Sequence, residues 1–85
     1  MEDQVRAVLS TVPQLAGIVE DLPSDADLWS AGMNSLTSVQ VLMRLEDSFD
    51  IEFREEDLTR ETFGSLRTIA AAVSALLAAT ENHRS

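Results

Sequence analysis

The residue best placed to do chemistry is Ser35, which follows Gly32 and Asn34 and precedes an apolar run in the stretch SAGMNSLTSVQVLMRLED, residues 30–47. The serine nucleophile of an enzyme needs a general base close by. The one histidine, His83, is near the C-terminal end, and the other six basic residues are all arginines, whose side chains do not deprotonate usefully. The sequence therefore predicts no catalytic residue and no enzymatic activity.

Acidic residues upstream of Ser35 begin a calcium-binding pattern without completing it. Asp25 and Asp27 occupy its first and third positions. Its turn glycine would be Ser30 and its final bidentate glutamate would be Leu36, so the pattern fails where it matters most. The chain has no cysteine, which removes thiolate ligands and disulfides and indicates a reducing compartment. We predict no metal site.

The composition is that of one small acidic domain. The chain has 85 residues, of which 45% are hydrophobic, and a net charge of −9. That charge disfavours nucleic-acid binding, which needs a positive surface. It can serve solubility alone, or it can attract basic patches on partner proteins. No apolar run is long enough for a membrane span, and residues 1–20 lack the layout of a signal peptide. We expect a cytoplasmic monomer.

The helical spacing of apolar residues predicts an all-α fold with three main helices and a short helix between the second and the last. Pro13 should end or kink the first helix, because proline lacks the backbone N–H and disfavours helical geometry in the preceding residue. In the connection that follows, Ser24 and Asp27 can cap a short turn that carries Leu28 and Trp29. The predicted segments are a first helix over 2–12, a connection over 16–34, a second helix over 35–49, helical turns over 55–59, a last helix over 65–79 and a flexible tail over 80–85.

Apolar residues outside the second helix should complete one core. Leu15 and Ile18 are predicted to pack inward after the first helix. Phe53, Leu58 and Phe63 are the apolar anchors of the polar segment before the last helix. The buried face of the last helix is predicted to consist of Leu66, Ile69, Val73, Leu76 and Leu77.

The second helix carries more apolar residues than one buried face needs. At about 100° per residue, one face holds a core stripe made of Ser38, Val41, Leu42, Leu45 and Phe49. A second stripe, Leu36, Val39 and Met43, lies roughly opposite. A small helical domain cannot easily bury both, so we predict that the second stripe faces solvent and docks partner proteins together with Glu46 and Asp47. The alternative is that this stripe packs against the connection over 16–34.

Ser35 itself has two interpretations. A serine before a helix is usually an N-cap, whose hydroxyl satisfies a free backbone N–H. Asn34 is an equally good cap, however, and would free the Ser35 side chain to point outward. A phosphate group is well tolerated at a helix N-terminus, so an outward serine there is suited to modification by another enzyme.

The stretch LWSAGMNSLTSVQVLMRLEDSFDIEF, residues 28–53, resembles the region around the prosthetic-group serine of acyl and peptidyl carrier proteins. The residues in register with that pattern are Gly32, Met33, Ser35, Leu36, Glu46, Asp47 and Phe49. The resemblance implies a four-helix carrier bundle over residues 1–79. Two positions depart from the pattern: Asn34 stands where most members have Asp, and Ala31 replaces the more usual leucine.

The resemblance also implies a function and a set of partners. Ser35 would carry 4′-phosphopantetheine, donated by coenzyme A, and the thiol of this arm would hold an acyl or aminoacyl group as a thioester. The implied partners are a phosphopantetheinyl transferase, a loading ligase or acyltransferase, and a downstream acceptor enzyme. The alternative hypothesis is a small acidic adaptor that binds partners through the second helix, with Ser35 only a cap.

The class of cargo stays open at this level. The alanines of the last helix fit either a tight core or space for a guest chain. Trp29, if it is tucked beneath the 16–34 connection, would occupy space that a long chain might use. We therefore favour a short or small cargo.

Overall fold

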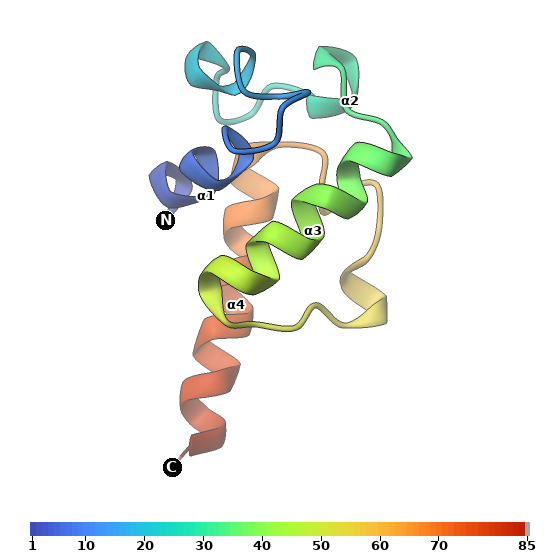
Figure 1. Ribbon diagram of the computed structural model, residues 1–85. Coiled ribbons are helices and arrows are strands. Elements are labelled where there is room, and N and C mark those ends of the chain that lie inside the picture. The colour runs from blue at the N-terminus through green and yellow to red at the C-terminus, as the bar shows by residue number, and fades with distance from the viewer. Residues whose placement is uncertain (85) are drawn as a thin grey trace.

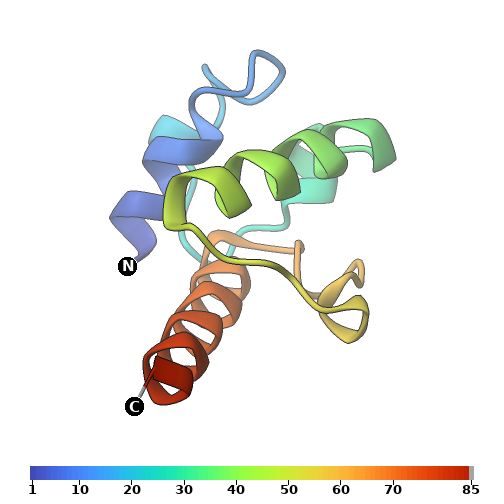
Figure 2. The same ribbon diagram turned by 60° about the horizontal axis from the view of Figure 1, so that its bottom comes forward.

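The computed structural model describes the backbone of residues 1–84 and the side chains of residues 1–79. Within that range all regular secondary structure is helical, without a strand, and the elements are α1 (Glu2–Leu9), η1 (Val19–Asp21), α2 (Leu28–Ala31), α3 (Ser35–Phe49), η2 (Glu55–Asp57) and α4 (Leu66–Arg84). The long helix α3 crosses the molecule, α1 packs against both α3 and α4, and the segment with η2 runs along the other side of α3 (Figure 1 and Figure 2). The predicted all-α bundle is confirmed, and the short element between the second and last main helices is a single 3-10 turn.

The first helix ends at Leu9, earlier than the predicted end at residue 12. The hydroxyls of Ser10 and Thr11 each donate to a carbonyl of the last helical turn, at 2.6 Å. The backbone N–H groups of Thr11 and Val12 bond three residues back, which is 3-10 rather than α geometry. The chain therefore turns before it reaches Pro13. Leu15 is fully buried, as predicted, and Ile18 is half-buried.

The cap of the short helix α2 is Asp27, and the predicted contribution of Ser24 to that cap is wrong. The Asp27 carboxylate accepts from the Trp29 backbone N–H at 3.1 Å and from the Ser30 hydroxyl at 2.8 Å. The Ser24 carbonyl instead accepts from the backbone N–H of Arg67, which joins this connection to the start of α4.

Helix α3 has the predicted bounds, and its buried side is centred on Thr37, Val41 and Leu45. Leu42 and Phe49 of the predicted core stripe are only half-buried. The helix stops after Phe49 because Asp50 adopts the left-handed conformation (φ 53°, ψ 50°), which ends the hydrogen-bond ladder. The buried side of α3 thus starts one position earlier than predicted, at Thr37 instead of Ser38.

The core is one cluster to which every main helix contributes. On α4, Leu66, Ile69, Val73 and Leu76 are buried as predicted, and Leu77 is half-buried. Phe53 and Phe63 are buried as predicted, with ring centroids 5.6 Å apart. The predicted anchor Leu58 is wrong, since its side chain is 48% exposed. The largest fully buried side chains include Val5, Leu9, Leu15, Leu28, Val41, Leu45, Leu66 and Ile69.

Helix α4 continues to Arg84, beyond the predicted end at Ala79. The predicted flexible tail over 80–85 falls where the side chains, and for Ser85 also the backbone, lie outside the described residues, so its flexibility stays a prediction. Through residue 84, no helix combines the length and hydrophobicity that crossing a membrane requires.

Arg6 fastens α1 to the turn around η1, a contact that periodicity does not reveal. Its Nη1 donates to the carbonyl oxygens of Val19, of Leu22 at 2.7 Å and, at 3.5 Å, of Glu20. The Val19 carbonyl also accepts from the Leu22 backbone N–H at 3.3 Å, whereas the later carbonyls at the end of a 3-10 turn have no partner within the turn. The half-buried Arg6 guanidinium satisfies these carbonyls and fixes where the long connection begins.

We expect Arg6→Met to lower the free energy of unfolding by about 2 kcal/mol, because charge-assisted hydrogen bonds are lost and carbonyl groups are left without a partner. Urea denaturation measures the change. Arg67→Met is the matched control, since the exposed Arg67 side chain makes no hydrogen bond or ion pair with the described residues. Equal losses in the two variants would contradict the assigned role of Arg6.

Candidate functional site

Ser35 is the first residue of α3, and its neighbour Asn34 is the N-cap. The Asn34 side-chain oxygen accepts from the Thr37 backbone N–H at 2.8 Å. Ser35 is exposed, and its hydroxyl makes no hydrogen bond with any residue in the described part of the chain. The hypothesis in which Ser35 serves only as the cap is therefore wrong, and the Ser35 hydroxyl is free to react.

The backbone of the segment between α2 and Ser35 is fixed by the conformation of Gly32 and by a hydrogen bond of Met33. Gly32 closes α2 with φ 132°, a conformation that side-chain-bearing residues rarely adopt. Met33 is 5% exposed, and its N–H donates to the Leu28 carbonyl at 3.0 Å. These contacts fix the position from which α3 starts, so Ser35 sits on a rigid element.

A groove of about 430 Å³ lies beside Ser35. One wall belongs to α3 and is formed by Ser35, Ser38, Val39 and Leu42. The opposite wall is formed by Trp29, Leu58, Thr59, Arg60 and Phe63. A group attached to the Ser35 oxygen would therefore begin at this groove.

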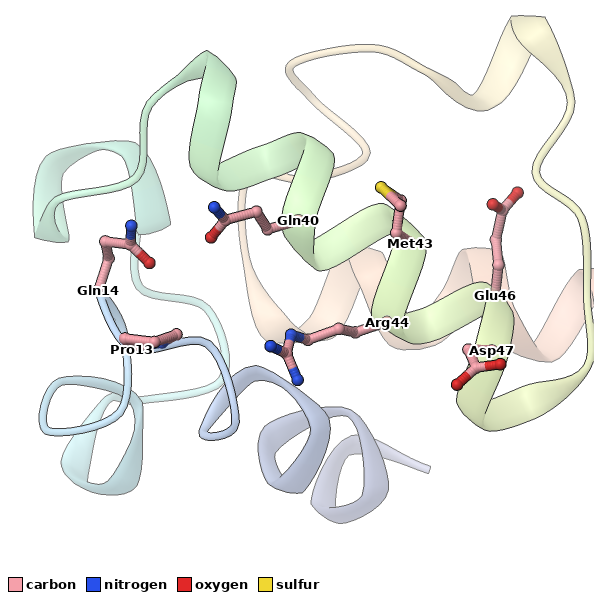
Figure 3. A pocket seen from close by; sticks show the side chains of 7 residues that line it. All are labelled: Pro13, Gln14, Gln40, Met43, Arg44, Glu46 and Asp47. Carbon is pink, nitrogen blue, oxygen red and sulfur yellow. The ribbon is translucent and has the colours of Figure 1, made fainter.

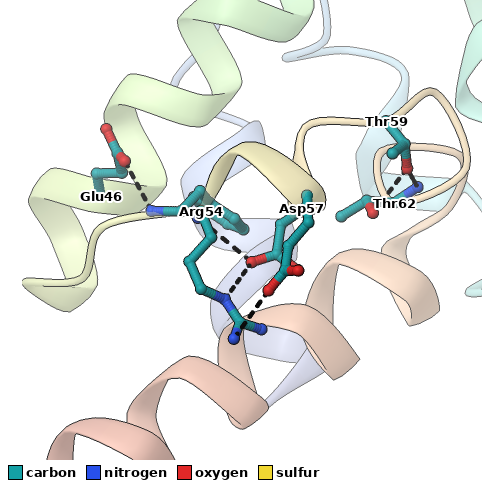
Figure 4. Close-up of polar contacts among 7 residues, drawn as sticks. Glu46, Arg54, Asp57, Thr59 and Thr62 are labelled. Atoms are coloured by element: carbon teal, nitrogen blue, oxygen red, sulfur yellow. Dashed lines mark hydrogen bonds and ion pairs between the residues drawn. The ribbon is translucent and has the colours of Figure 1, made fainter.

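Polar contacts shape the segment that builds the opposite wall (Figure 4). The Glu46 carboxylate of α3 accepts from the Phe53 backbone N–H at 2.9 Å. Asp57 accepts from the backbone N–H and the Nε of Arg54, at 3.3 and 3.2 Å. The Thr59 hydroxyl accepts from the Thr62 N–H at 3.1 Å. Local turns of this kind hold an otherwise irregular segment against α3.

Trp29 joins α2 to the same wall. Its Nε1–H donates to the Arg60 carbonyl at 3.0 Å, and the Arg60 guanidinium lies 4.8 Å from the ring centroid, within cation–π distance. The condition considered for Trp29, a position beneath the 16–34 connection, is not met, because its N–H and ring contact Arg60 in the 58–63 segment. The indole N–H is a hydrogen-bond donor, and the Arg60 carbonyl supplies its acceptor.

The second stripe of α3 faces solvent, as predicted. Leu36, Val39 and Met43 are 68%, 48% and 62% exposed, so the alternative of packing against the 16–34 connection is wrong. Met43, Glu46 and Asp47 border a broad depression of about 810 Å³ between α3 and the loop after α1 (Figure 3). Glu46 is half-buried and bound to Phe53, whereas Asp47 is exposed. That these residues dock partners stays a prediction.

Few charged groups lie at the site, and Asp27 shows a shifted pKa. The hydrogen bond from the Ser30 hydroxyl lowers the pKa of Asp27 below its ordinary value. Desolvation opposes this shift, and the Trp29 and Ser30 backbone N–H groups and the charge of Arg60 add to it. Arg60 is the only charged residue that lines the groove. Within the described residues, no group of three or more acidic or histidine side chains could hold a metal ion.

The molecule is a small helical bundle, and the Ser35 hydroxyl at the start of its long helix makes no hydrogen bond with the residues that the structure describes. This arrangement suits a protein that carries a covalently attached group. Residues 3–73 match the family model described as the phosphopantetheine attachment site. The chain belongs to this family and is a carrier protein, which holds acyl or aminoacyl groups as thioesters on a 4′-phosphopantetheine arm.

Similar proteins carry amino acids. The chain is 36% identical over 77 residues to an aminoacyl carrier protein of Agrobacterium fabrum, covering 91% of this chain and 93% of that one. It is 31% identical over 74 residues to a D-alanyl carrier protein of Lactococcus lactis, covering 86% and 91%.

Two solved structures are similar to this chain. A chain in the crystal structure of an engineered Bradyrhizobium japonicum glycine:[carrier protein] ligase, complexed with a carrier protein from Agrobacterium tumefaciens and ATP, matches with a TM-score of 0.80 and 35% identity, covering 87% of this chain and 96% of that one. A solution structure of an Agrobacterium tumefaciens protein matches with a TM-score of 0.75 and 35% identity, covering 96% and 99%.

The residues around Ser35 fit the prosthetic group. The serine oxygen is accessible and unbonded, and the adjoining groove offers one cationic side chain and several apolar ones. The sequence pattern indicated Ser35 as the attachment residue and Val39 as part of the exposed stripe, but it did not indicate Trp29 and Arg60 as residues of this groove. The one available signal was that a tryptophan close to the site needs an acceptor for its N–H.

We expect Asn34→Ala to lower the free energy of unfolding by about 1 kcal/mol, because the Thr37 N–H loses its acceptor. Thermal and urea denaturation measure the effect. Asn34→Asp is the control, since a carboxylate accepts the same hydrogen bond and also suits the positive end of the helix dipole. If both variants unfold like the parent protein, the cap has been misassigned.

Proposed function

We propose that Ser35 is the residue that carries the phosphopantetheine arm and that the cargo is a small amino acid such as glycine. The observation that carries the assignment of Ser35 is its exposed, unbonded hydroxyl next to a separate capping residue. Ser38 shares the same groove, but its hydroxyl already donates to the Ser35 carbonyl at 2.7 Å.

The attachment requires an external catalyst. The Ser35 oxygen forms a bond with the phosphorus that carries the pantetheine part of coenzyme A, the pyrophosphate bond breaks, and adenosine bisphosphate leaves. The serine proton passes to a base of the phosphopantetheinyl transferase, because no basic side chain other than Arg60 lines the groove and arginine stays protonated. The chain itself acts as a carrier and not as an enzyme.

Two observations support a small cargo. Ala71, Ala75 and Ala78 of α4 are exposed, whereas Ala70 is buried and Ala72 packs against the core, so most of these small side chains do not line an internal space for a long acyl chain. The similar proteins of known cargo carry D-alanine or are described as aminoacyl carriers, and a solved relative is complexed with a glycine ligase. A ligase that activates a small amino acid is therefore the loading partner, and an acceptor enzyme removes the cargo afterwards.

Incubation of the protein with coenzyme A and a broad-specificity transferase should raise its intact mass by one phosphopantetheine. Ser35→Ala should abolish the gain, because no other groove residue replaces the free hydroxyl. Ser38→Ala is the matched control and should be modified like the parent. Circular dichroism checks that both variants are folded. Modification of Ser35→Ala, or no modification of the folded parent by any transferase, would overturn the assignment.

The thermal stability of glycyl and octanoyl thioester forms tests the cargo. A chain that enters a helical core buries apolar surface, at about 0.8 kcal/mol per methylene before other costs. We expect the two forms to melt at similar temperatures, because the exposed alanines of α4 provide no internal lining for an octanoyl chain. Marked stabilisation by octanoyl alone, with shifted NMR signals of core residues, would contradict a small cargo.

A further inference from the structure

The groove beside Ser35 carries a charge opposite to that of the rest of the molecule. The chain has a net charge of −9, whereas the groove is lined by one cation, Arg60, and by no carboxylate. A phosphodiester on the Ser35 oxygen is an anion. Over most of this acidic surface it would meet like charges, and in the groove it meets a guanidinium.

Arg60 differs from the other arginines that contact the fold. Arg6 donates to backbone carbonyls, Arg44 donates to the Thr11 hydroxyl, and Arg54 is paired with Glu56 and Asp57. The Arg60 guanidinium makes no ion pair and no hydrogen bond with the described residues. Its planar fork of N–H donors, well suited to phosphate oxygens, is therefore available.

The rest of the groove is apolar and partly uncovered. Leu58 and Val39 are each 48% exposed on opposite walls, and Trp29, which is half-buried, lines the groove beside Arg60. Leu58 is not part of the hydrophobic core, so its partly exposed side chain is available to contact a group in the groove. In the arm, the phosphate is joined through one methylene to a carbon that bears two methyl groups, so its proximal half combines an anion with an apolar group in that order.

We propose that this groove binds the proximal half of the phosphopantetheine arm, with Arg60 pairing with the phosphodiester and Trp29 and Leu58 contacting the adjacent dimethyl group. The proposal rests on the attachment at Ser35. The hydrogen bond from Trp29 Nε1 to the Arg60 carbonyl positions the arginine backbone relative to α2. Arg60 and Trp29 are binding residues for the arm and take no part in its attachment.

Trp29 is the only tryptophan in the chain, so its indole N–H gives one NMR signal that reports on the groove. We expect this signal to move between the apo and holo forms of ¹⁵N-labelled protein. In Arg60→Gln, most of the apo-to-holo displacement should be lost. Added salt should reduce it in the parent, because an exposed ion pair is screened. Arg67→Gln, which changes an exposed arginine outside the groove, should keep the full displacement.

Intact mass is measured on every sample, so that this proposal and the attachment are tested separately. Absence of a mass gain would overturn the attachment at Ser35 and the proposal with it. Complete modification without movement of the Trp29 signal would overturn only the groove proposal. A displacement that is equally large in Arg60→Gln and the parent would also overturn it, because the guanidinium would then play no part.

Discussion

The geometry around Ser35 depends on the hydrogen bond from the Thr37 backbone N–H to the Asn34 side chain. A helix start leaves backbone N–H groups without partners, and a side-chain oxygen must satisfy one of them. If Ser35 supplied that oxygen, attachment of a group would compete with the cap. Two adjacent residues divide these tasks, so chemistry at the Ser35 oxygen leaves the first turn of α3 intact. The start of α3 does not depend on the Ser35 hydroxyl, because Asn34 makes the capping hydrogen bond.

The two sides of α3 also have separate roles. Its Thr37, Val41 and Leu45 side is locked into the core, which leaves the opposite side rigid and uncovered. The acidic residues around it fall into two kinds. Glu46 holds the following segment through the Phe53 N–H, whereas Asp47 is exposed and contributes only charge. A basic partner approaching this face would be guided by the exposed acids, while the bound Glu46 keeps the wall of the groove in place.

Local spacing was enough to predict the bounds of α3, the buried face of α4 and the outward position of Ser35, because each depends on residues within a few turns of one another. The contacts that shape the groove were not predictable in this way. Trp29 and the Arg60 carbonyl are 31 positions apart, and Arg6 reaches carbonyls 13 to 16 positions away. No periodicity links such partners. Leu58 was expected in the core because it is apolar, and only the tertiary structure places it in a groove wall.

A carrier must hold its arm without keeping it from partner enzymes, and the strength of the Arg60 interaction fits both needs. An ion pair between exposed groups contributes at most about 1 kcal/mol, since water and salt screen it. At room temperature 1.4 kcal/mol corresponds to a tenfold ratio, so such a pair alone favours the groove by less than about tenfold. The arm then divides its time between the groove and solvent. Because Arg60 is exposed and the groove is open on one side, a partner enzyme can draw the arm out at small cost while α3 and the Asn34 cap stay unchanged.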